Sequence, residues 1–156
     1  MFTIRKYEAQ YQNRLLQFLE ICLPQSDRKF EPDGRHKMYR NVTGYFEHFW
    51  CLFDGEDMIG TAALKKLDSG RCELKALYLL EKYHKKGLGR RLLNTVLQKA
   101  RQDGYGEIYL DTLSSSRRAV CLYEKGGFER TERYNENYTA DIFMVLKLSE
   151  AGGSLS

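Results

Sequence analysis

A short glycine-containing turn surrounded by positive charge is the segment of this sequence best suited to chemistry. In Tyr78–Leu93, YLLEKYHKKGLGRRLL, a strand-like apolar stretch leads through Gly87 and Gly89 into a helix-like stretch. Glycines in such a turn let successive backbone N–H groups point into one concavity, and the start of a helix adds unpaired N–H groups and a positive dipole end. The turn is therefore suited to bind phosphate. The basic residues around it are Lys82, His84, Lys85, Lys86, Arg90 and Arg91.

The turn does not have the pattern of two common phosphate-binding loops. It contains no GxxxxGK[ST] sequence and no three-glycine dinucleotide fingerprint. Instead, His84–Gly89 resembles motif A of the GNAT superfamily, (Arg/Gln)-x-x-Gly-x-(Gly/Ala). The resemblance implies that the backbone N–H groups of Lys85–Arg90 bind the pyrophosphate of acetyl-CoA. His84 stands where the family has Arg or Gln, and Lys85 stands where a further glycine is common.

A second stretch, Ala119–Phe128, resembles the A-x-x-L-Y-x-x-x-G-F element of the same family. This resemblance implies that the Tyr123 hydroxyl lies by the coenzyme sulfur and stabilises or protonates the leaving thiolate. Ser116 stands three residues before Ala119, where the family often has Asn. The family also implies a bulged fourth strand whose backbone faces the thioester, here Leu77–Leu80. The coenzyme-binding residues implied are Leu77, Leu79, His84, Lys85, Lys86, Gly87, Leu88, Gly89, Arg90 and Ser116.

The reaction that the resemblance implies is direct transfer of the acetyl group from acetyl-CoA to an amine. An alkylamine has a pKa of about 10, so it must lose a proton before it can attack, and a base or a water chain is needed. We predict that Glu73, on the strand expected to line the acceptor side, is this base and acts through water. The alternative is an ordinary strand carboxylate paired with Lys75. Asp111 and Glu136 are the other candidates.

The resemblance implies that the acceptor side is walled by residues 30–49 and by the final pair of strands. Glu31, Arg35 and Tyr39 offer an aromatic wall and both signs of charge. Such a lining would suit a small polar amine better than a long basic peptide. The competing interpretation is that the aromatic residues of this stretch belong to the core.

The elements that must position these residues follow from apolar periodicity and turn residues. At 156 residues the chain fits one domain, residues 1–150, followed by a flexible tail, residues 151–156. The predicted order β-α-α-β-β-β-α-β-α-β-β indicates an α/β domain with a mixed sheet. The family resemblance implies that this is a GNAT-like, mostly antiparallel central sheet flanked by helices. The predicted strands are Phe2–Tyr7, Trp50–Phe53, Met58–Lys66, Cys72–Leu80, Ile108–Leu110, Arg130–Tyr134 and Tyr138–Leu148. The predicted helices are a first one closed by Pro24, a second over Arg35–Phe49, a third between Leu88 and Gly104, and a fourth over Arg117–Lys125 that Ser114–Ser116 can cap.

Composition narrows the remaining choices. Apolar residues make up 42% and charged residues 29% of the chain, the balance of a soluble globular protein. No apolar run approaches the roughly 18 residues of a membrane span, and the N-terminus lacks the apolar core of a signal peptide, so we expect a cytoplasmic protein with no membrane partner. The cysteines have no zinc-site spacing, which predicts no metal and buried, reduced thiols. They are Cys22, Cys51, Cys72 and Cys121.

Two other classes of function stay open. The basic cluster and the many aromatic residues would suit a nucleic-acid-binding module, although the net charge is only +4 and no recognition motif occurs. The second is an acyl-CoA sensor that kept the fold and lost turnover, since His84 and Ser116 depart from the family pattern while Tyr123 keeps it. The sequence does not identify the acceptor amine, and it is compatible with a monomer or a homodimer.

Overall fold

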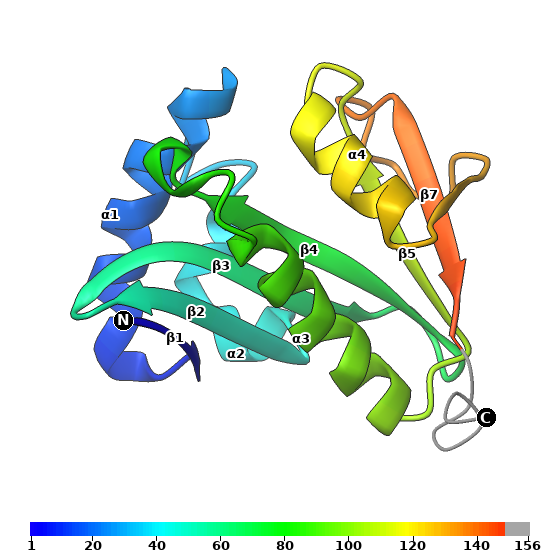
Figure 1. The fold of residues 1–156 in the computed structure, drawn as a ribbon, viewed down its shortest axis with the longest axis horizontal. Coiled ribbons are helices and arrows are strands. Elements are labelled where there is room, and N and C mark those ends of the chain that lie inside the picture. Colours follow the sequence, from blue (N-terminus) through cyan, green and yellow to red (C-terminus); the bar gives the residue numbers. More distant parts are fainter. Residues whose placement is uncertain (149–156) are drawn as a thin grey trace. The chain divides into compact units, whose positions relative to one another are not determined.

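The computed structural model describes residues 1–148, so the predicted tail, residues 151–156, lies outside the described residues. Within the described chain, seven strands form a mixed sheet in the order β1-β2-β3-β4-β5-β7-β6 (Figure 1). The β4–β5 pair is parallel, and the β1–β2, β2–β3, β5–β7 and β6–β7 pairs are antiparallel. The predicted fold class is therefore confirmed.

The strands are β1 (Phe2–Lys6), β2 (His48–Asp54), β3 (Asp57–Lys66), β4 (Arg71–Leu79), β5 (Glu107–Thr112), β6 (Glu129–Arg130) and β7 (Ile142–Lys147). The α-helices are α1 (Gln12–Cys22), α2 (Val42–Tyr45), α3 (Leu88–Gln102) and α4 (Arg117–Lys125). Short 3-10 helices are η1 (Ala9–Tyr11), η2 (Leu23–Ser26), η3 (Lys37–Arg40) and η4 (Glu81–Tyr83).

The chain divides into two compact units, and both β4 and α3 contribute to each of them. The first unit comprises residues 1–65 and 75–94, and the second comprises residues 66–74 and the chain from residue 95 onward. The division within β4 falls between Leu74 and Lys75. The candidate base and the glycine turn therefore belong to different units, and each is described below within its own.

In the first unit, α1 and α2 lie beside β1–β3 (Figure 1) and share a hydrophobic core with them. Alternation along β2 directs every second side chain to this core, namely Phe49, Cys51 and Phe53. Helix α1 meets them with the apolar stripe that its sequence spacing predicts, including Leu15 and Leu19. The β2–β3 hairpin turns at Gly55, whose φ of +63° suits a glycine.

The apolar periodicity of the third helix is confirmed by burial. Six side chains spaced three and four residues apart along α3 are buried, which accounts for its strong amphipathic pattern. They are Leu88, Leu92, Leu93, Val96, Leu97 and Ala100. The helix ends at Gln102, and Gly104 follows with a φ of +87°, as expected for a glycine beyond a helix C-terminus.

One continuous helix over Arg35–Phe49 is wrong. The chain instead forms η3 and the four-residue helix α2, and then enters β2 at His48. Gly44 weakens the helix, and the Asn41 side chain packs into the space that a Cβ would need, 2.4 Å from the ideal Cβ position. Phe46 is already extended, with φ −102° and ψ 144°.

The final strand pair is shorter than expected. Residues 131–141 form an irregular segment because asparagine side chains replace strand pairing there. The Asn137 N–H donates to Asn135 Oδ1 at 3.0 Å, and the Thr139 N–H donates to Asn137 Oδ1 at 3.3 Å.

Gly60 of β3 permits a close approach to the end of β4. A Cβ at this position would lie 3.0 Å from the Tyr78 carbonyl oxygen and 3.2 Å from Leu79 Cδ1. We predict that Gly60→Ala lowers the free energy of unfolding by about 1–3 kcal/mol, because backbone must move to accept the methyl group. Urea denaturation followed by circular dichroism measures this loss.

Gly70→Ala is the matched control for this prediction. No atom lies within 4 Å of its ideal Cβ position. The same chemical change should leave stability unchanged or raise it by about 0.4–1 kcal/mol. Equal losses in both variants would contradict the role assigned to the contact at Gly60.

Candidate functional site

The glycine turn between β4 and α3 has the backbone conformation that an anion-binding turn needs. Lys85 has a φ of +67° and Gly87 a φ of +76°, and α3 begins at Leu88. Left-handed residues in a turn before a helix direct N–H groups toward one side, where the helix N-terminus adds its own donors. No atom lies within 4 Å of an ideal Cβ at Gly87, so the backbone is open to a ligand there. The left-handed Lys85 explains why glycine would also suit that position.

Two side chains hold this turn against the rest of the first unit. His84 Nε2 lies 3.1 Å from the Leu79 carbonyl oxygen. Because a carbonyl oxygen can only accept, this nitrogen carries the hydrogen. The Tyr83 hydroxyl donates to Asp54 Oδ2 at 2.8 Å, and this bond is the main reason why the pKa of Tyr83 is raised. His84 is therefore directed to the end of β4.

The end of β4 is irregular at Ala76, which has a φ of +53°. A non-glycine residue in this conformation costs about 1–2 kcal/mol and needs support from its surroundings. Thr61 supplies part of it, because its buried hydroxyl donates to the Ala76 carbonyl oxygen at 2.7 Å. This irregularity lies directly before Leu77–Leu80, the stretch for which a bulge that faces the thioester is predicted.

Glu73, the predicted base, is buried in the second unit with only 3% of its surface exposed. Its Oε2 accepts a hydrogen bond from the Tyr134 hydroxyl at 2.6 Å and another from Asn135 Nδ2 at 3.1 Å. Asn135 Nδ2 also donates to Asp111 Oδ2 at 2.6 Å, and Asn137 Nδ2 donates to Asp111 Oδ1 at 3.1 Å. A hydrogen-bonded network therefore joins two carboxylates on neighbouring strands, and two of the three base candidates belong to it.

Sheet register explains why Glu73 and Asp111 share a face. Glu73 pairs with Tyr109 across the parallel β4–β5 ladder, and Asp111 lies two residues farther along β5. Side chains two apart on a strand point to the same face. Tyr134 packs on that face with its ring 4.9 Å from the Tyr109 ring and 5.8 Å from the Phe143 ring. Burial, followed by the nearby Glu73 carboxylate, raises the pKa of Tyr134 well above its usual value, so this hydroxyl is a donor.

Tyr123 lies within α4, and Ser116 is the residue directly before this helix. Tyr123 is buried, and its ring centroid lies 5.9 Å from that of Phe128. The loop Ser114–Ser116, predicted to cap the helix, supplies its N-cap residue, Ser116, but the Ser116 side chain makes no capping hydrogen bond. Its carbonyl oxygen accepts from the Val120 N–H at 3.0 Å instead.

The three predicted acceptor-binding residues have different environments. Arg35 is exposed and Glu31 is half-buried. Tyr39 belongs to the hydrophobic core, is 5% exposed, and packs against the rings of Phe46 and Phe49. Burial raises its pKa well above the usual value. Tyr39 therefore has little surface to offer a substrate.

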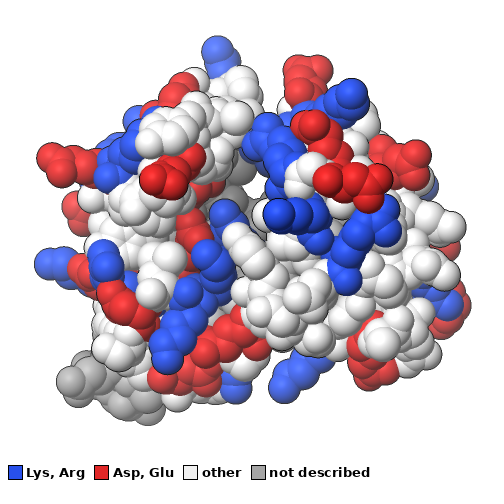
Figure 2. All heavy atoms as spheres, turned by 180° about the vertical axis from the view of Figure 1, so that it is seen from behind, with Lys and Arg blue, Asp and Glu red and all other residues white. Residues whose placement is uncertain are grey.

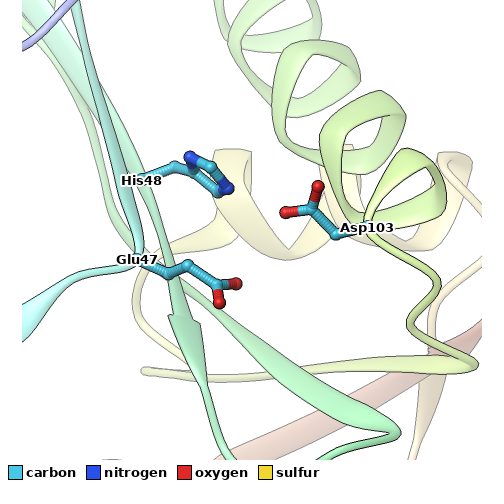
Figure 3. Close-up of side chains that lie close together, drawn as sticks. All are labelled: Glu47, His48 and Asp103. Atoms are coloured by element: carbon cyan, nitrogen blue, oxygen red, sulfur yellow. The ribbon is translucent and has the colours of Figure 1, made fainter.

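Several polar residues now placed near the predicted site were not singled out in the sequence. Tyr134 and Asn135 lie 61 and 62 residues from Glu73, so no local spacing relates them to it. Three further polar side chains, drawn in Figure 3, also went unnoticed: Glu47 just before β2, His48 at its beginning, and Asp103 just after α3. His48 stacks on Trp50 with ring centroids 5.6 Å apart, and Asp103 pairs with Lys99 at 3.5 Å. No sequence pattern distinguished these residues from ordinary surface groups.

The surface and the cysteines bear on the other expectations. On the face drawn in Figure 2, lysine and arginine side chains are interspersed with aspartate and glutamate. Among the described residues, no helix is long and apolar enough to cross a membrane.

Cys22, Cys51 and Cys72 are buried as expected, but Cys121 is exposed because it lies on the outer side of amphipathic α4.

Comparison with known sequences gives a consistent family. The sequence profile described as the acetyltransferase (GNAT) family matches residues 13–128. An uncharacterized N-acetyltransferase of Bacillus subtilis is 31% identical over 105 residues, which are 64% of this chain and 69% of that protein. N-acetyltransferase 8B of Rattus norvegicus is 35% identical over 91 residues, 55% of this chain and 41% of that protein. The chain thus matches less than half of the length of the rat relative.

Solved structures agree on the fold. An acetyltransferase of the GNAT family from Staphylococcus aureus Mu50 superposes with a TM-score of 0.87 at 22% identity, covering 96% of this chain and all of that one. A GNAT family acetyltransferase from Elizabethkingia anophelis with acetyl-CoA bound has a TM-score of 0.67 at 22% identity, covering 94% and 98%. At such identities the likeness establishes the fold alone.

His36 generates a pH-dependent prediction for the loop that contains Glu31 and Arg35. The Glu31 N–H donates to His36 Nδ1 at 2.9 Å. Burial, and secondly the charge of Arg35, lower the pKa of His36 below 6.5, so folding favours the neutral ring. The unfolded chain then binds more protons, so stability is fully present above about pH 6.5 and is lost as the pH falls toward the folded-state pKa.

We predict that His36→Asn weakens this pH dependence, because an amide oxygen can still accept from Glu31 but does not titrate. Urea unfolding of both proteins at about pH 7.5 and about pH 5 measures it. The native protein should lose more stability than the variant, by about 1.4 kcal/mol for each unit by which folding lowers the pKa. Identical losses in the two proteins would contradict the prediction.

Proposed function

Because the chain belongs to the acetyltransferase (GNAT) family, we propose that it moves the acetyl group of acetyl-CoA directly to the amine of a small molecule. The observation that carries the proposal is the left-handed turn at Lys85 and Gly87 directly before α3. It provides backbone donors at a helix N-terminus within a basic cluster, as a pyrophosphate requires. The bound acetyl-CoA of the related Elizabethkingia anophelis structure supports the choice of coenzyme.

On the donor side, the backbone from Lys85 to Arg90 binds the pyrophosphate, and the backbone at Leu77 and Leu79 binds the acetyl-pantetheine end. The lysine and arginine side chains of the turn add attraction for phosphate. His84 contributes through the shape of the turn, since its ring is bonded to the Leu79 carbonyl oxygen. Replacement of the family's Arg or Gln by His at this position is therefore compatible with coenzyme binding through backbone donors.

For the chemical step, we assign proton removal to Glu73 and protonation of the thiolate to Tyr123. Glu73 accepts a proton from the ammonium group of the acceptor, directly or through water, and leaves a neutral amine. The amine nitrogen attacks the thioester carbon, and the C–S bond breaks. The coenzyme thiolate leaves and takes a proton from the Tyr123 hydroxyl, and the cationic nitrogen of the new amide then gives its excess proton, directly or through water, to the Tyr123 phenolate. The burial of both side chains supports these roles, because hydrogen bonds act more strongly away from water.

The acceptor binds, in this proposal, against the loop that carries Glu31 and Arg35. An exposed guanidinium suits an amine that also bears a carboxylate, since Arg binds carboxylates through two parallel hydrogen bonds. Tyr39 acts from within the core and shapes the loop. Screening by mass spectrometry with acetyl-CoA and amino acids, polyamines and basic peptides tests this choice. Gain of one acetyl group by none of them would favour an acyl-CoA sensor.

We also place the protein in the cytoplasm, on the grounds of its thiols. Burial raises the pKa of Cys22 and of Cys51 to about 12, so both stay protonated and unreactive. Cys121 is an exposed free thiol. Reducing compartments maintain such groups. Fractionation of cells followed by immunoblotting would test the location.

The donor site predicts a specific effect of Gly87→Val. The substitution disfavours the φ of +76° and puts a side chain where the backbone must approach phosphate, although no atom of the unliganded protein obstructs it. We expect the dissociation constant of acetyl-CoA to rise about ten-fold or more, because hydrogen bonds to a charged group are lost. Isothermal titration calorimetry on the folded variant measures it.

Gly104→Val is the matched control, because Gly104 also has a positive φ, +87°, and no atom within 4 Å of its ideal Cβ position. It should carry similar backbone strain without loss of acetyl-CoA affinity. Unchanged affinity in folded Gly87→Val would contradict the placement of the pyrophosphate.

Tyr123→Phe tests the assigned acid. Removal of the hydroxyl alone should lower kcat by about 10²–10⁴-fold and leave the dissociation constant of acetyl-CoA nearly unchanged. Steady-state kinetics with the best amine of the screen, beside calorimetry, separates the two quantities. Normal turnover would mean that Tyr123 serves only to pack against Phe128.

A further inference from the structure

The segment between β6 and β7, residues 131–141, carries several side chains that form long-range hydrogen bonds. Its Tyr134 and Asn135 are the two donors whose hydrogen bonds converge on Glu73 Oε2, at 2.6 and 3.1 Å. One is a phenol and the other an amide, and neither carries charge at neutral pH. Their arrangement around a buried acid is more specific than the single partner expected of an ordinary strand carboxylate.

The segment is itself held in place by Arg133. The guanidinium donates to the Asn137 carbonyl oxygen at 2.8 Å and to the Ala140 carbonyl oxygen at 3.2 Å. It also lies over the rings of Tyr138 and Phe143, 5.0 and 4.6 Å from their centroids. At the far end, Asp141 accepts from the N–H and the hydroxyl of Ser114, at 2.7 and 2.6 Å. Residues 134 and 135 are thus presented to Glu73 by an anchored loop.

The face of the sheet that carries Glu73 is crowded with polar groups. The Asp111 carboxylate lies on the same face and shares the Asn135 amide with Glu73. A buried carboxylate loses its hydration, and the hydrogen bonds donated by Tyr134 and Asn135 replace part of it. The other titratable and charged groups on this face include Tyr109 and Glu107 of β5, joined by a hydrogen bond of 3.0 Å, and Arg71 of β4, whose guanidinium lies 5.7 Å from the centroid of the Tyr109 ring.

We propose that Tyr134 and Asn135 are positioning residues that hold the Glu73 carboxylate in one orientation for proton removal from the acceptor amine. This inference rests on the proposed function, in which Glu73 is the base. Glu73 performs the proton transfer, and the two donors act through it. The loop 131–141 thereby takes part in the reaction through Glu73.

Tyr134→Phe tests the inference, because it removes only the hydroxyl and keeps the ring between Tyr109 and Phe143. The pH dependence of kcat/KM is measured with acetyl-CoA and the best amine of the screen. We expect the acid limb of this profile, the fall of kcat/KM at low pH, to move to higher pH by about one unit. A hydrogen bond to a charged group changes a protonation equilibrium by about ten-fold or more. Asn135→Ala should move it in the same direction. Free coenzyme is quantified by chromatography, because the exposed Cys121 would consume a thiol reagent.

Tyr138→Phe is the matched control on the same loop. Tyr138 is 75% exposed, and phenylalanine retains the ring beneath Arg133. Its acid limb should coincide with that of the native enzyme. An equal shift in Tyr138→Phe, or a uniform loss of rate in Tyr134→Phe with no shift, would overturn the inference, since either would indicate a structural role.

The Glu73→Gln variant separates the positioning role of Tyr134 and Asn135 from the proposed role of Glu73 as the base. An inactive Glu73→Gln enzyme combined with unmoved acid limbs in Tyr134→Phe and Asn135→Ala would overturn the positioning role alone. An active Glu73→Gln enzyme would overturn the assignment of Glu73 as the base and the inference with it. Loss of activity in Glu73→Gln together with shifted limbs supports both.

Discussion

The burial of the Glu73 carboxylate is the constraint on which the second compact unit depends. An ionised carboxylate removed from water loses hydration worth on the order of several kcal/mol, and hydrogen-bond donors must replace it. The donors come from Tyr134 and Asn135, in a segment that forms neither helix nor strand. A regular hairpin there would alternate side chains between two faces, whereas the observed loop brings consecutive residues to one carboxylate. The irregular structure of residues 131–141 thus allows two consecutive side chains to donate hydrogen bonds to the buried Glu73 carboxylate.

In the first unit the main constraint is instead the left-handed backbone conformation of a few residues near the glycine turn and the end of β4. Ala76, Lys85 and Gly87 have positive φ values, and only the last is a glycine. The other two conformations are strained, and local strain persists where surrounding contacts support it. The Thr61 hydroxyl donates to the Ala76 carbonyl oxygen. His84, which directly precedes Lys85, donates from its ring to the Leu79 carbonyl oxygen at the end of β4. Both strained residues lie where the proposed coenzyme would meet the backbone.

A site built from backbone N–H groups and a site built around a buried carboxylate tolerate amino-acid substitution to different degrees. A phosphate site built from backbone N–H groups keeps its donors when side chains change, so His84 can occupy a position that the family fills with Arg or Gln. A site built from a buried carboxylate depends on particular side-chain donors, because a donor lost in the interior is not replaced by water. Departures from the family pattern at the turn therefore say less about activity than a change around Glu73 would.

Local signals in the sequence determined most of the framework and the position of the glycine turn before α3. The Asp54-Gly55 hairpin, the stripe of α3, the bounds of α4 and the glycine turn all depend on residues within a few positions of one another. Helix and strand periods act over that same range, so these features were predictable. The same local rules failed for Arg35–Phe49, where apolar spacing indicated one helix but packing of Asn41 against Gly44 and the entry into β2 divided the segment.

Tertiary structure alone decided which side chains surround the candidate base and which aromatic residues are core. Glu73 and Tyr134 are 61 residues apart and meet only because the register of β4, β5 and β7 brings them to one face. Tyr39 and Arg35 were equivalent candidates in the sequence, and folding buried the first and left the second exposed. Burial and long-range hydrogen bonds depend on how separate elements pack. A sequence pattern specifies the preferences of each element, but the partners of a side chain are set only when the sheet is assembled.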